Sequence, residues 1–154
     1  MIYKVYYSLM EDTRHISHTC GYMLTKLGQA AFDGFARKLA PLGLRPKHCG
    51  ALALLEALKQ PSQQSLGKAL GVAPSAMVVV LDDLEGLNAI RRVADPDDRR
   101  KFSVELTSVG GDLLRSATRL ANALDAELLA HLSAAEQETL RRLLAKSAGA
   151  ASGR

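Results

Sequence analysis

The sequence predicts a mainly helical domain that carries one small β-hairpin. Apolar residues make up 47% of the 154 residues, which is enough to bury a core without metal ions or disulfides. Aromatic residues are only 5%, and apolar positions recur in steps of three and four over long stretches, as amphipathic helices require. Residues 91–106 instead alternate apolar and polar side chains on either side of a turn, which indicates two short strands.

A long first helix is predicted over residues 16–42, after an N-terminal extension of residues 1–15. Pro41 and Gly43 are suited to ending this helix, because proline removes a backbone donor and glycine accepts a left-handed turn. Helical spacing places on one face the residues Cys20, Met23, Leu24, Leu27, Ala31, Phe35 and Leu39.

Three shorter helices are predicted next. Pro46 suits the first turn of the second helix, and Pro61 closes that helix. Ser62 is a candidate N-cap for the third helix, which Gly71 ends, and Pro74 opens the fourth. The third and fourth helices, joined by a three-residue turn, form a helix-turn-helix. The inward positions expected on the fourth helix are Met77, Val80, Leu81 and Leu84.

The hairpin of residues 91–106 has an apolar and a cationic face. Its second strand places Phe102, Val104 and Leu106 on the face expected to be buried. The alternate residues of that strand are Lys101, Ser103 and Glu105. A hairpin of this kind directly after a helix-turn-helix is the wing of a winged helix-turn-helix, an element that contacts DNA.

Two further helices complete the predicted domain. Thr107 is expected to cap a fifth helix that runs nearly to His131, and Ser133 with Glu136 has the spacing of a capping box for a sixth. The glycine-rich tail of residues 147–154 is expected to be disordered. Because both terminal helices are longer than the middle unit is wide, we expect a partner subunit to cover their apolar faces.

The charge and cysteine content set bounds on the function. A formal net charge of +4 permits a nucleic-acid partner without requiring one. Cys20 and Cys49 have no Cys-x-x-Cys spacing, so neither a disulfide scaffold nor a zinc site is indicated. We find no signal peptide or membrane-spanning segment and expect a cytoplasmic protein. No phosphate loop, serine elbow or other catalytic motif occurs, so the sequence does not indicate an enzyme.

The chain contains three short motifs, which are Leu42-Gly43-Leu44, Asp95-Pro96-x-Asp98-Arg99-Arg100 and Leu106-Thr107-x-x-Gly110. Together they resemble those of the MarR (multiple antibiotic resistance regulator) family of transcription regulators. The resemblance covers residues 16–146. It implies a homodimer held by residues 16–44 and 107–146, around a DNA-binding unit of residues 46–106. It also implies a fourth helix in the major groove, wing arginines in the minor groove, and release from DNA by a small phenolic or other anionic ligand, or by an oxidant.

The fourth helix departs from the family pattern, because it has three acidic residues and no basic one between residues 72 and 87. Base reading is then expected from Ser75 and from valine methyl groups against thymine methyl groups, which favours an A/T-rich site. Asn88 stands where the family usually has glycine, and asparagine tolerates the left-handed turn. The groove-facing candidates are Ser75, Val78, Val79 and Asp82.

Most of the attraction to phosphate is therefore expected to come from the wing. Arg99 is the candidate for the minor groove, because a planar guanidinium fits that narrow, negative site. Arg100 is a further candidate for a DNA contact, and the alternative role is to hold the turn by pairing with Asp95 or Asp98. Further backbone contacts are assigned to Arg91, Arg92, Lys101 and Lys68, with Arg45 and Lys47 as additional candidates.

Tyr22, Met23, Phe32 and Cys49 are candidates for an effector pocket, although ordinary packing explains them equally well. The four histidines, at positions 15, 18, 48 and 131, lack metal-site spacing and are expected at surfaces or helix ends, so we expect neither a metal nor a cofactor. Free cysteines are usually buried, small apolar residues.

The predicted function is a homodimeric transcription regulator, a repressor released from a pseudo-palindromic operator by a small-molecule effector. One alternative is a winged-helix interaction module that has lost specific DNA reading, which the acidic fourth helix suggests. The other is an oxidant-sensing regulator in which Cys20 is the reactive thiol.

Overall fold

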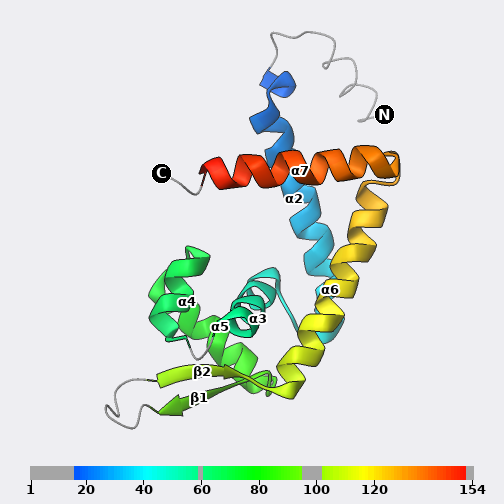
Figure 1. Cartoon of the computed structure of the whole chain (residues 1–154). Helices are drawn as coiled ribbons and strands as arrows, with labels where there is room; N and C mark the ends of the chain where they lie inside the picture. The colour runs from blue at the N-terminus through cyan, green and yellow to red at the C-terminus, as the bar shows by residue number, and fades with distance from the viewer. Residues whose placement is uncertain (1–15, 59–60, 95–101, 152–154) are drawn as a thin grey trace.

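The computed structural model describes residues 16–58, 61–94 and 102–151. Within these ranges the fold is helical with a two-stranded antiparallel wing, which confirms the predicted fold class. The long helices α2 (Cys20–Leu39) and α6 (Ser108–Leu128) pack side by side, and the remaining helices of the DNA-binding unit lie at one end of this pair (Figure 1).

The first helix begins later than the periodicity indicates. A 3-10 turn, η1 (Ile16–His18), precedes it, and the Thr19 side chain accepts a hydrogen bond from the Tyr22 amide at 3.3 Å. A second turn, η2 (Ala40–Leu42), follows α2, and Gly43 then adopts a left-handed φ of 67°. The cap at Thr19 explains the later start, because its side-chain oxygen satisfies an amide that has no partner within the helix.

The helix-turn-helix is formed as predicted. Helix α3 (Pro46–Ala57) leads to α4 (Gln63–Leu70), where the Ser62 hydroxyl accepts from the Ser65 amide at 3.1 Å. Gly71 has a φ of 61° and ends α4 before α5 (Pro74–Gly86) begins. All four residues predicted to face inward from α5 are buried, namely Met77, Val80, Leu81 and Leu84. Asn88 has the expected positive φ, 55°.

The wing consists of β1 (Ile90–Ala94) and β2 (Phe102–Leu106), paired so that Ile90 lies opposite Leu106. Its buried face is shorter than predicted, because Val104 is 1% exposed but Phe102 is 49% exposed. The backbone amide of Val104 donates to the Pro61 carbonyl at 3.1 Å, so this strand meets the core at Val104 and extends beyond it at Phe102.

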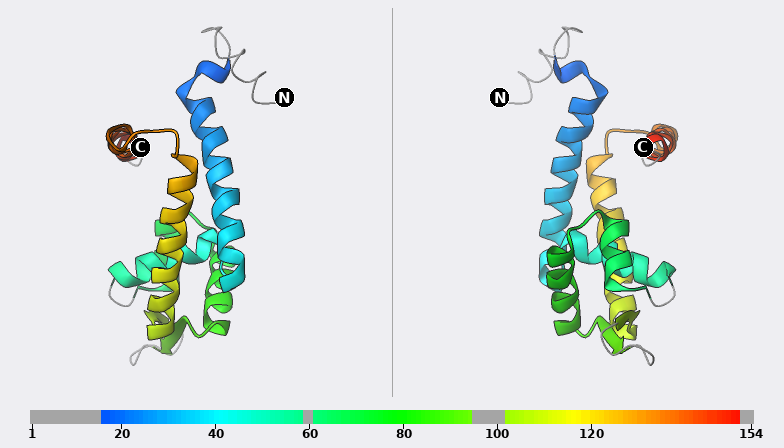
Figure 2. Two further views of the ribbon diagram at one scale, coloured as in Figure 1. Left: turned by 90° about the vertical axis from the view of Figure 1, so that its right-hand side faces the viewer. Right: turned by 90° about the vertical axis from the view of Figure 1, so that its left-hand side faces the viewer.

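The last helix continues further than predicted. After α6, which Thr107 caps through the Gly110 amide at 3.1 Å, the Ser133 and Glu136 pair begins α7 (Ala134–Ala151). The expected disordered tail is therefore wrong for residues 147–151, which are helical. Figure 2 shows α7 nearly end-on and standing away from α2, with α6 between them. Leu143 and Leu144 on this helix are 51% and 41% exposed.

The core lies within the DNA-binding unit and the adjoining halves of α2 and α6. Leu39, Leu52, Leu66 and Leu84 are fully buried there. Among the described residues no single helix is long and apolar enough to span a membrane. Helices α4 and α5 reach the required length and apolar composition only when they are taken as one segment, and the two are bent by 111° relative to each other.

Candidate nucleic-acid interface

Helix α5 presents one side to the core and the opposite side to solvent. Ser75, Val78 and Asp82 are exposed on the outer side, where the sequence places the groove-facing residues. Val79 is also 52% exposed, but it lines a cavity between α5 and the helices behind it. Val79 therefore borders both the solvent and the cavity, and the assignment of these four residues to the major groove stays a prediction.

The acidic residues of α5 all have basic partners. Arg92, on β1, contacts two of them, with its Nη2 atom 2.5 Å from Asp82 Oδ1 and its Nη1 atom against Glu85. The Arg92 side chain is only 24% exposed. We therefore assign Arg92 to holding the wing on α5, in place of the phosphate contact predicted from the sequence.

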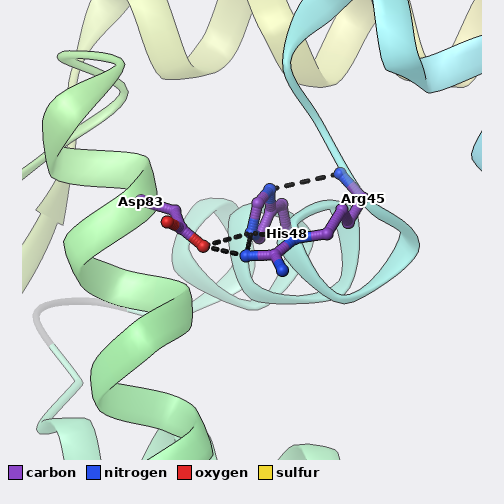
Figure 3. A network of polar contacts seen from close by, with 3 residues as sticks. All are labelled: Arg45, His48 and Asp83. Atoms are coloured by element: carbon purple, nitrogen blue, oxygen red, sulfur yellow. Dashed lines mark hydrogen bonds and ion pairs between the residues drawn. The ribbon is translucent and has the colours of Figure 1, made fainter.

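The third acid, Asp83, faces the start of α3. Figure 3 shows its carboxylate directed at His48 and Arg45. The Arg45 guanidinium contacts Asp83 Oδ2, and His48 Nε2 lies 3.3 Å from the same oxygen. The backbone amide of Arg45 donates to His48 Nδ1 at 3.2 Å, and His48 Nε2 lies 3.3 Å from both Arg45 Nε and Asp83 Oδ2. A neutral ring that accepts at Nδ1 carries its proton on Nε2, so Asp83 is the acceptor for that proton. Arg45 thus contacts α5 in this structure, where the sequence made it an additional phosphate contact.

His48 is a buried residue, with 1% of its surface exposed. As expected for a histidine at a helix end, it lies in the first turn of α3, but its ring is buried and bridges α3 and α5. Burial, together with the nearby Arg45 charge, lowers the pKa of His48 below its ordinary 6.5, although its hydrogen bond to Asp83 opposes the shift. The ring is therefore neutral at pH 7.

Two further basic candidates for phosphate contacts are exposed. Lys68 projects from α4, and the side chain of Arg91 is 70% exposed while pairing with Glu105 across the wing at 2.5 Å. The other wing predictions lie outside the described residues and stay predictions: Asp95, Asp98, Arg99, Arg100 and Lys101.

A cavity of about 430 Å³ lies behind α5. Its walls come from α2, from the start of α3 and from α5, so it adjoins both the helical arms and the DNA-binding unit. The residues that line it are Phe32, Ala36, Arg45, Pro46, Lys47, Ala76, Val79 and Val80.

Of the four predicted pocket residues, Phe32 lines this cavity and the others do not. Tyr22 and Met23 lie more than two turns nearer the start of α2, and the Tyr22 ring lies 5.6 Å from Lys26 Nζ. Cys49 packs against the core, and burial raises the pKa of its thiol to about 11. That thiol is protonated at neutral pH and unreactive.

Cys20 differs from the expectation for a free cysteine, because it is exposed at the first residue of α2. Its oxidant-sensing role stays a prediction. Within residues 16–58, 61–94 and 102–151, no three histidine, cysteine or acidic side chains are grouped so that they could hold a metal ion.

Comparison with known proteins decides the family. Residues 46–102 match the model of the MarR family. The HTH-type transcriptional repressor Rv2887 of Mycobacterium tuberculosis is 32% identical over 126 residues, which cover 82% of this chain and 91% of the repressor. This chain belongs to the MarR family. It is accordingly a winged helix-turn-helix transcriptional repressor and not an enzyme.

Solved structures agree with this MarR assignment. The transcriptional repressor CouR, bound to a 23-mer DNA duplex, superimposes with a TM-score of 0.77 and 29% identity, covering 89% of this chain and 97% of CouR. The complex of M. tuberculosis Rv2887 with salicylic acid gives a TM-score of 0.69 and 32% identity, with 83% and 95% coverage. The wing and the helix-turn-helix of this MarR protein are therefore those of a known DNA-binding architecture.

Proposed function

We propose that this MarR protein is a homodimeric repressor that leaves its operator when a small phenolic or anionic ligand occupies the cavity behind α5. The observation that carries the proposal is the double role of α5, which presents an outer side to solvent and forms one wall of the cavity with Ala76, Val79 and Val80. A duplex bound to CouR and salicylic acid bound to Rv2887 support the two halves of the proposal.

Base reading is assigned to the outer side of α5 in the major groove. The Ser75 hydroxyl supplies a donor and an acceptor, and the Val78 methyl groups suit the thymine methyl group. Asp82 lies at the edge of this side and is paired with Arg92, so its charge is partly balanced. We expect A/T-leaning half-sites, and a G-rich half-site from binding-site selection would contradict this assignment.

Affinity for the DNA backbone is assigned to Lys68, Arg91 and the wing residues Arg99, Arg100 and Lys101. Anisotropy titrations with labelled DNA from upstream of its own coding sequence, at two salt concentrations, should show specific binding that weakens steeply with salt. Lys68→Ala should weaken binding to all sequences alike. It should also reduce the steepness of the fall of log K with log salt concentration, the salt slope, by about 1 per subunit. Lys26→Ala, on the remote half of α2, is the matched control. An interaction module would show no sequence-specific binding.

The homodimer rests on apolar surface that the single chain leaves exposed. Leu24 and Leu27 on α2 are 48% and 63% exposed, and α7 presents Leu143 and Leu144. Almost all described side chains of α7 are exposed, and the stability of protein helices comes mostly from packing of an apolar face, which indicates a partner for α7. Sedimentation at micromolar concentration should give a dimer, and the double variant Leu143→Glu/Leu144→Glu should shift it to monomers. A wild-type monomer at that concentration would contradict the proposal.

Dimerisation also sets the operator geometry. Two α5 helices that enter successive major grooves must lie about 34–36 Å apart, which gives a pseudo-palindrome with half-sites one helical turn apart. Insertion of five base pairs between the half-sites should therefore weaken binding strongly, while insertion of a full turn at one end of the duplex should not.

A Cys20-based oxidant response is a separate candidate, supported by the exposure of that residue. If Cys20 is the sensor, peroxide should release operator DNA from the wild type and not from Cys20→Ser. An equal response in both proteins would exclude this trigger and leave the ligand-release proposal intact.

A further inference from the structure

Arg45 belongs to two structural features at once. Its guanidinium pairs with Asp83 of α5, and the same side chain lines the cavity between α2, α3 and α5. The side chains of Arg45 and Asp83 are 60% and 40% exposed, so solvent reaches the ion pair from outside. A molecule that enters the cavity therefore meets a guanidinium that already has a carboxylate partner.

The cavity walls favour a particular ligand chemistry. Phe32, Pro46 and Val80 are among the six apolar residues that line it, and Arg45 and Lys47 provide two cations. Among the described residues, none of those that line the cavity is acidic. A flat apolar body fits such walls, and a carboxylate on that body matches the planar, bidentate donor fork of an arginine.

We propose that Arg45 is the carboxylate-binding residue of this cavity and that an aromatic carboxylate takes its guanidinium from Asp83. The inference rests on the proposed function and adds to it the means by which ligand and DNA compete. An ion pair whose partners are this exposed is weak, because water and salt screen it. A ligand carboxylate brought to Arg45 by apolar contacts can therefore displace the carboxylate of Asp83.

The exchange leaves Asp83 without a cationic partner. His48 remains within 3.3 Å, but burial, the largest cause of its lowered pKa, persists after the exchange and keeps the ring neutral at pH 7. A hydrogen bond from a neutral ring does not cancel the charge of the carboxylate. Asp83 then adds an unbalanced negative charge to α5.

That charge matters because α5 contains three acids and no basic residue between Pro74 and Gly86. Arg92 balances Asp82 and Glu85 from the wing, and Arg45 balances the remaining acid from α3. A helix that enters the major groove lies between two phosphate backbones, so an unpaired carboxylate on it weakens binding. Ligand occupancy and DNA occupancy thereby oppose each other through a single guanidinium.

The test measures DNA affinity by anisotropy with and without saturating salicylate, and salicylate affinity by calorimetry. The coupling factor is the ratio of the DNA affinity without salicylate to the DNA affinity with saturating salicylate. Such factors typically lie between about 5 and 150, and we expect the wild type to fall in that range. Asp83→Asn removes the carboxylate that competes for Arg45. It should bind salicylate at least about threefold more tightly, bind DNA no more weakly than the wild type, and lose most of the coupling, to a factor below about 3.

Asp112→Asn is the matched control, because Asp112 also forms an exposed pair with an arginine, Arg115, but lies on α6. It should keep the wild-type coupling. Arg45→Gln tests the other partner: salicylate affinity should fall at least about tenfold, and DNA affinity without ligand should fall as well, because Asp83 is unpaired. The double variant Arg45→Gln/Asp83→Asn should recover DNA affinity without recovering the salicylate response. Circular dichroism melts confirm that each variant is folded.

The outcomes separate this inference from the proposed function. Full coupling in Asp83→Asn, or wild-type salicylate affinity in Arg45→Gln, would overturn the exchange while the ligand-released repressor stands. Failure of the wild type to bind salicylate would overturn both the exchange and the effector half of the proposed function. Failure to bind any operator DNA specifically would overturn the proposed function itself.

Discussion

Arg92 of the wing lies 2.5 Å from Asp82 of α5, measured from Nη2 to Oδ1, and its other terminal nitrogen contacts Glu85. The two acids are three residues apart and therefore lie on one side of the helix. A single guanidinium consequently fastens the base of the wing to the helix assigned to base reading. The wing and α5, the two elements proposed to contact DNA, are therefore linked to each other through Arg92.

Replacing this residue should reduce both stability and DNA affinity. Arg92→Gln leaves two like charges on α5 and loosens the wing. The pair is partly exposed, so we expect a loss of about 1 kcal/mol, or about 2–4 °C in melting temperature. Operator affinity should fall about tenfold, as anisotropy at fixed salt will measure, because two acids on α5 lose their partner.

Arg91→Gln is the comparison for this prediction, because Arg91 is the neighbouring arginine and pairs across the wing with Glu105. It should lower the salt slope by about 1 per subunit with little change in melting temperature. Arg92 would be a phosphate contact after all if Arg92→Gln lowered the slope in the same way and left the melting temperature unchanged.

The local features of this fold were predictable from sequence. The caps at Ser62 and Thr107, the left-handed residues Gly71 and Asn88, and the buried stripe of α5 all depend on residues within one or two turns of each other. These features can be predicted because the two interacting groups lie only a few residues apart in the sequence.

The ion pairs and the cavity were not predictable in the same way. Asp83 is 38 residues from Arg45, and nothing in the spacing of the two indicates that α3 and α5 bring them together. The helical phase of Val79 predicts a place in the groove, but the phase does not show that this residue also lines a cavity with α2 and the start of α3. The acidic residues of α5 are the available signal, since three acids on a helix proposed to enter DNA require basic partners elsewhere in the chain.

The junction between wing and α6 should not tolerate a side chain at Gly110. A Cβ atom there would lie 2.1 Å from the Ala89 carbonyl oxygen, which belongs to the backbone and cannot move aside. We expect Gly110→Ala to lower the free energy of unfolding by about 2 kcal/mol or more in urea titrations.

Gly111→Ala provides the control for this prediction within the same helical turn. Its added Cβ would meet only the Nη1 atom of Arg115 at 3.4 Å, which is the mobile end of a long side chain. Because alanine favours helix more than glycine does, this variant should be neutral or up to about 1 kcal/mol more stable. Equal losses in the two variants would contradict the close approach at Ala89.

Asn88 should be replaceable by glycine and by little else. Its φ of 55° lies in the left-handed region, where a Cβ atom is strained in most residues. Asn88→Ala should destabilise the protein by about 1 kcal/mol, and Asn88→Gly should be neutral or slightly stabilising in the same urea titration. A larger loss for glycine than for alanine would show that the asparagine side chain, and not the backbone angle, is what this turn requires.

The stability of the protein should depend on pH through His48. Burial, and after it the charge of Arg45, lowers the pKa of this histidine in the folded state below 6.5. Between that lowered pKa and 6.5 the unfolded chain binds more protons than the folded one, so the free energy of unfolding rises with pH. The stabilisation is complete above pH 6.5 and is lost as the pH falls through the folded-state pKa. Urea titrations between pH 5 and 8 will measure this slope.

His48→Gln should flatten the slope, because glutamine keeps a polar group at the same place and does not titrate. His131→Gln is the control, because it removes an imidazole from the exposed turn after α6, where the ring bridges no helices.

The His48→Gln variant also tests the Arg45 exchange, since protonated His48 can replace Arg45 as the cationic partner of Asp83. Release of DNA by salicylate should therefore weaken in the wild type as the pH falls from 7.5 through the folded-state pKa of His48. In His48→Gln, release should not change over the same range, and a wild-type pH dependence in that variant would exclude His48 as the titrating group.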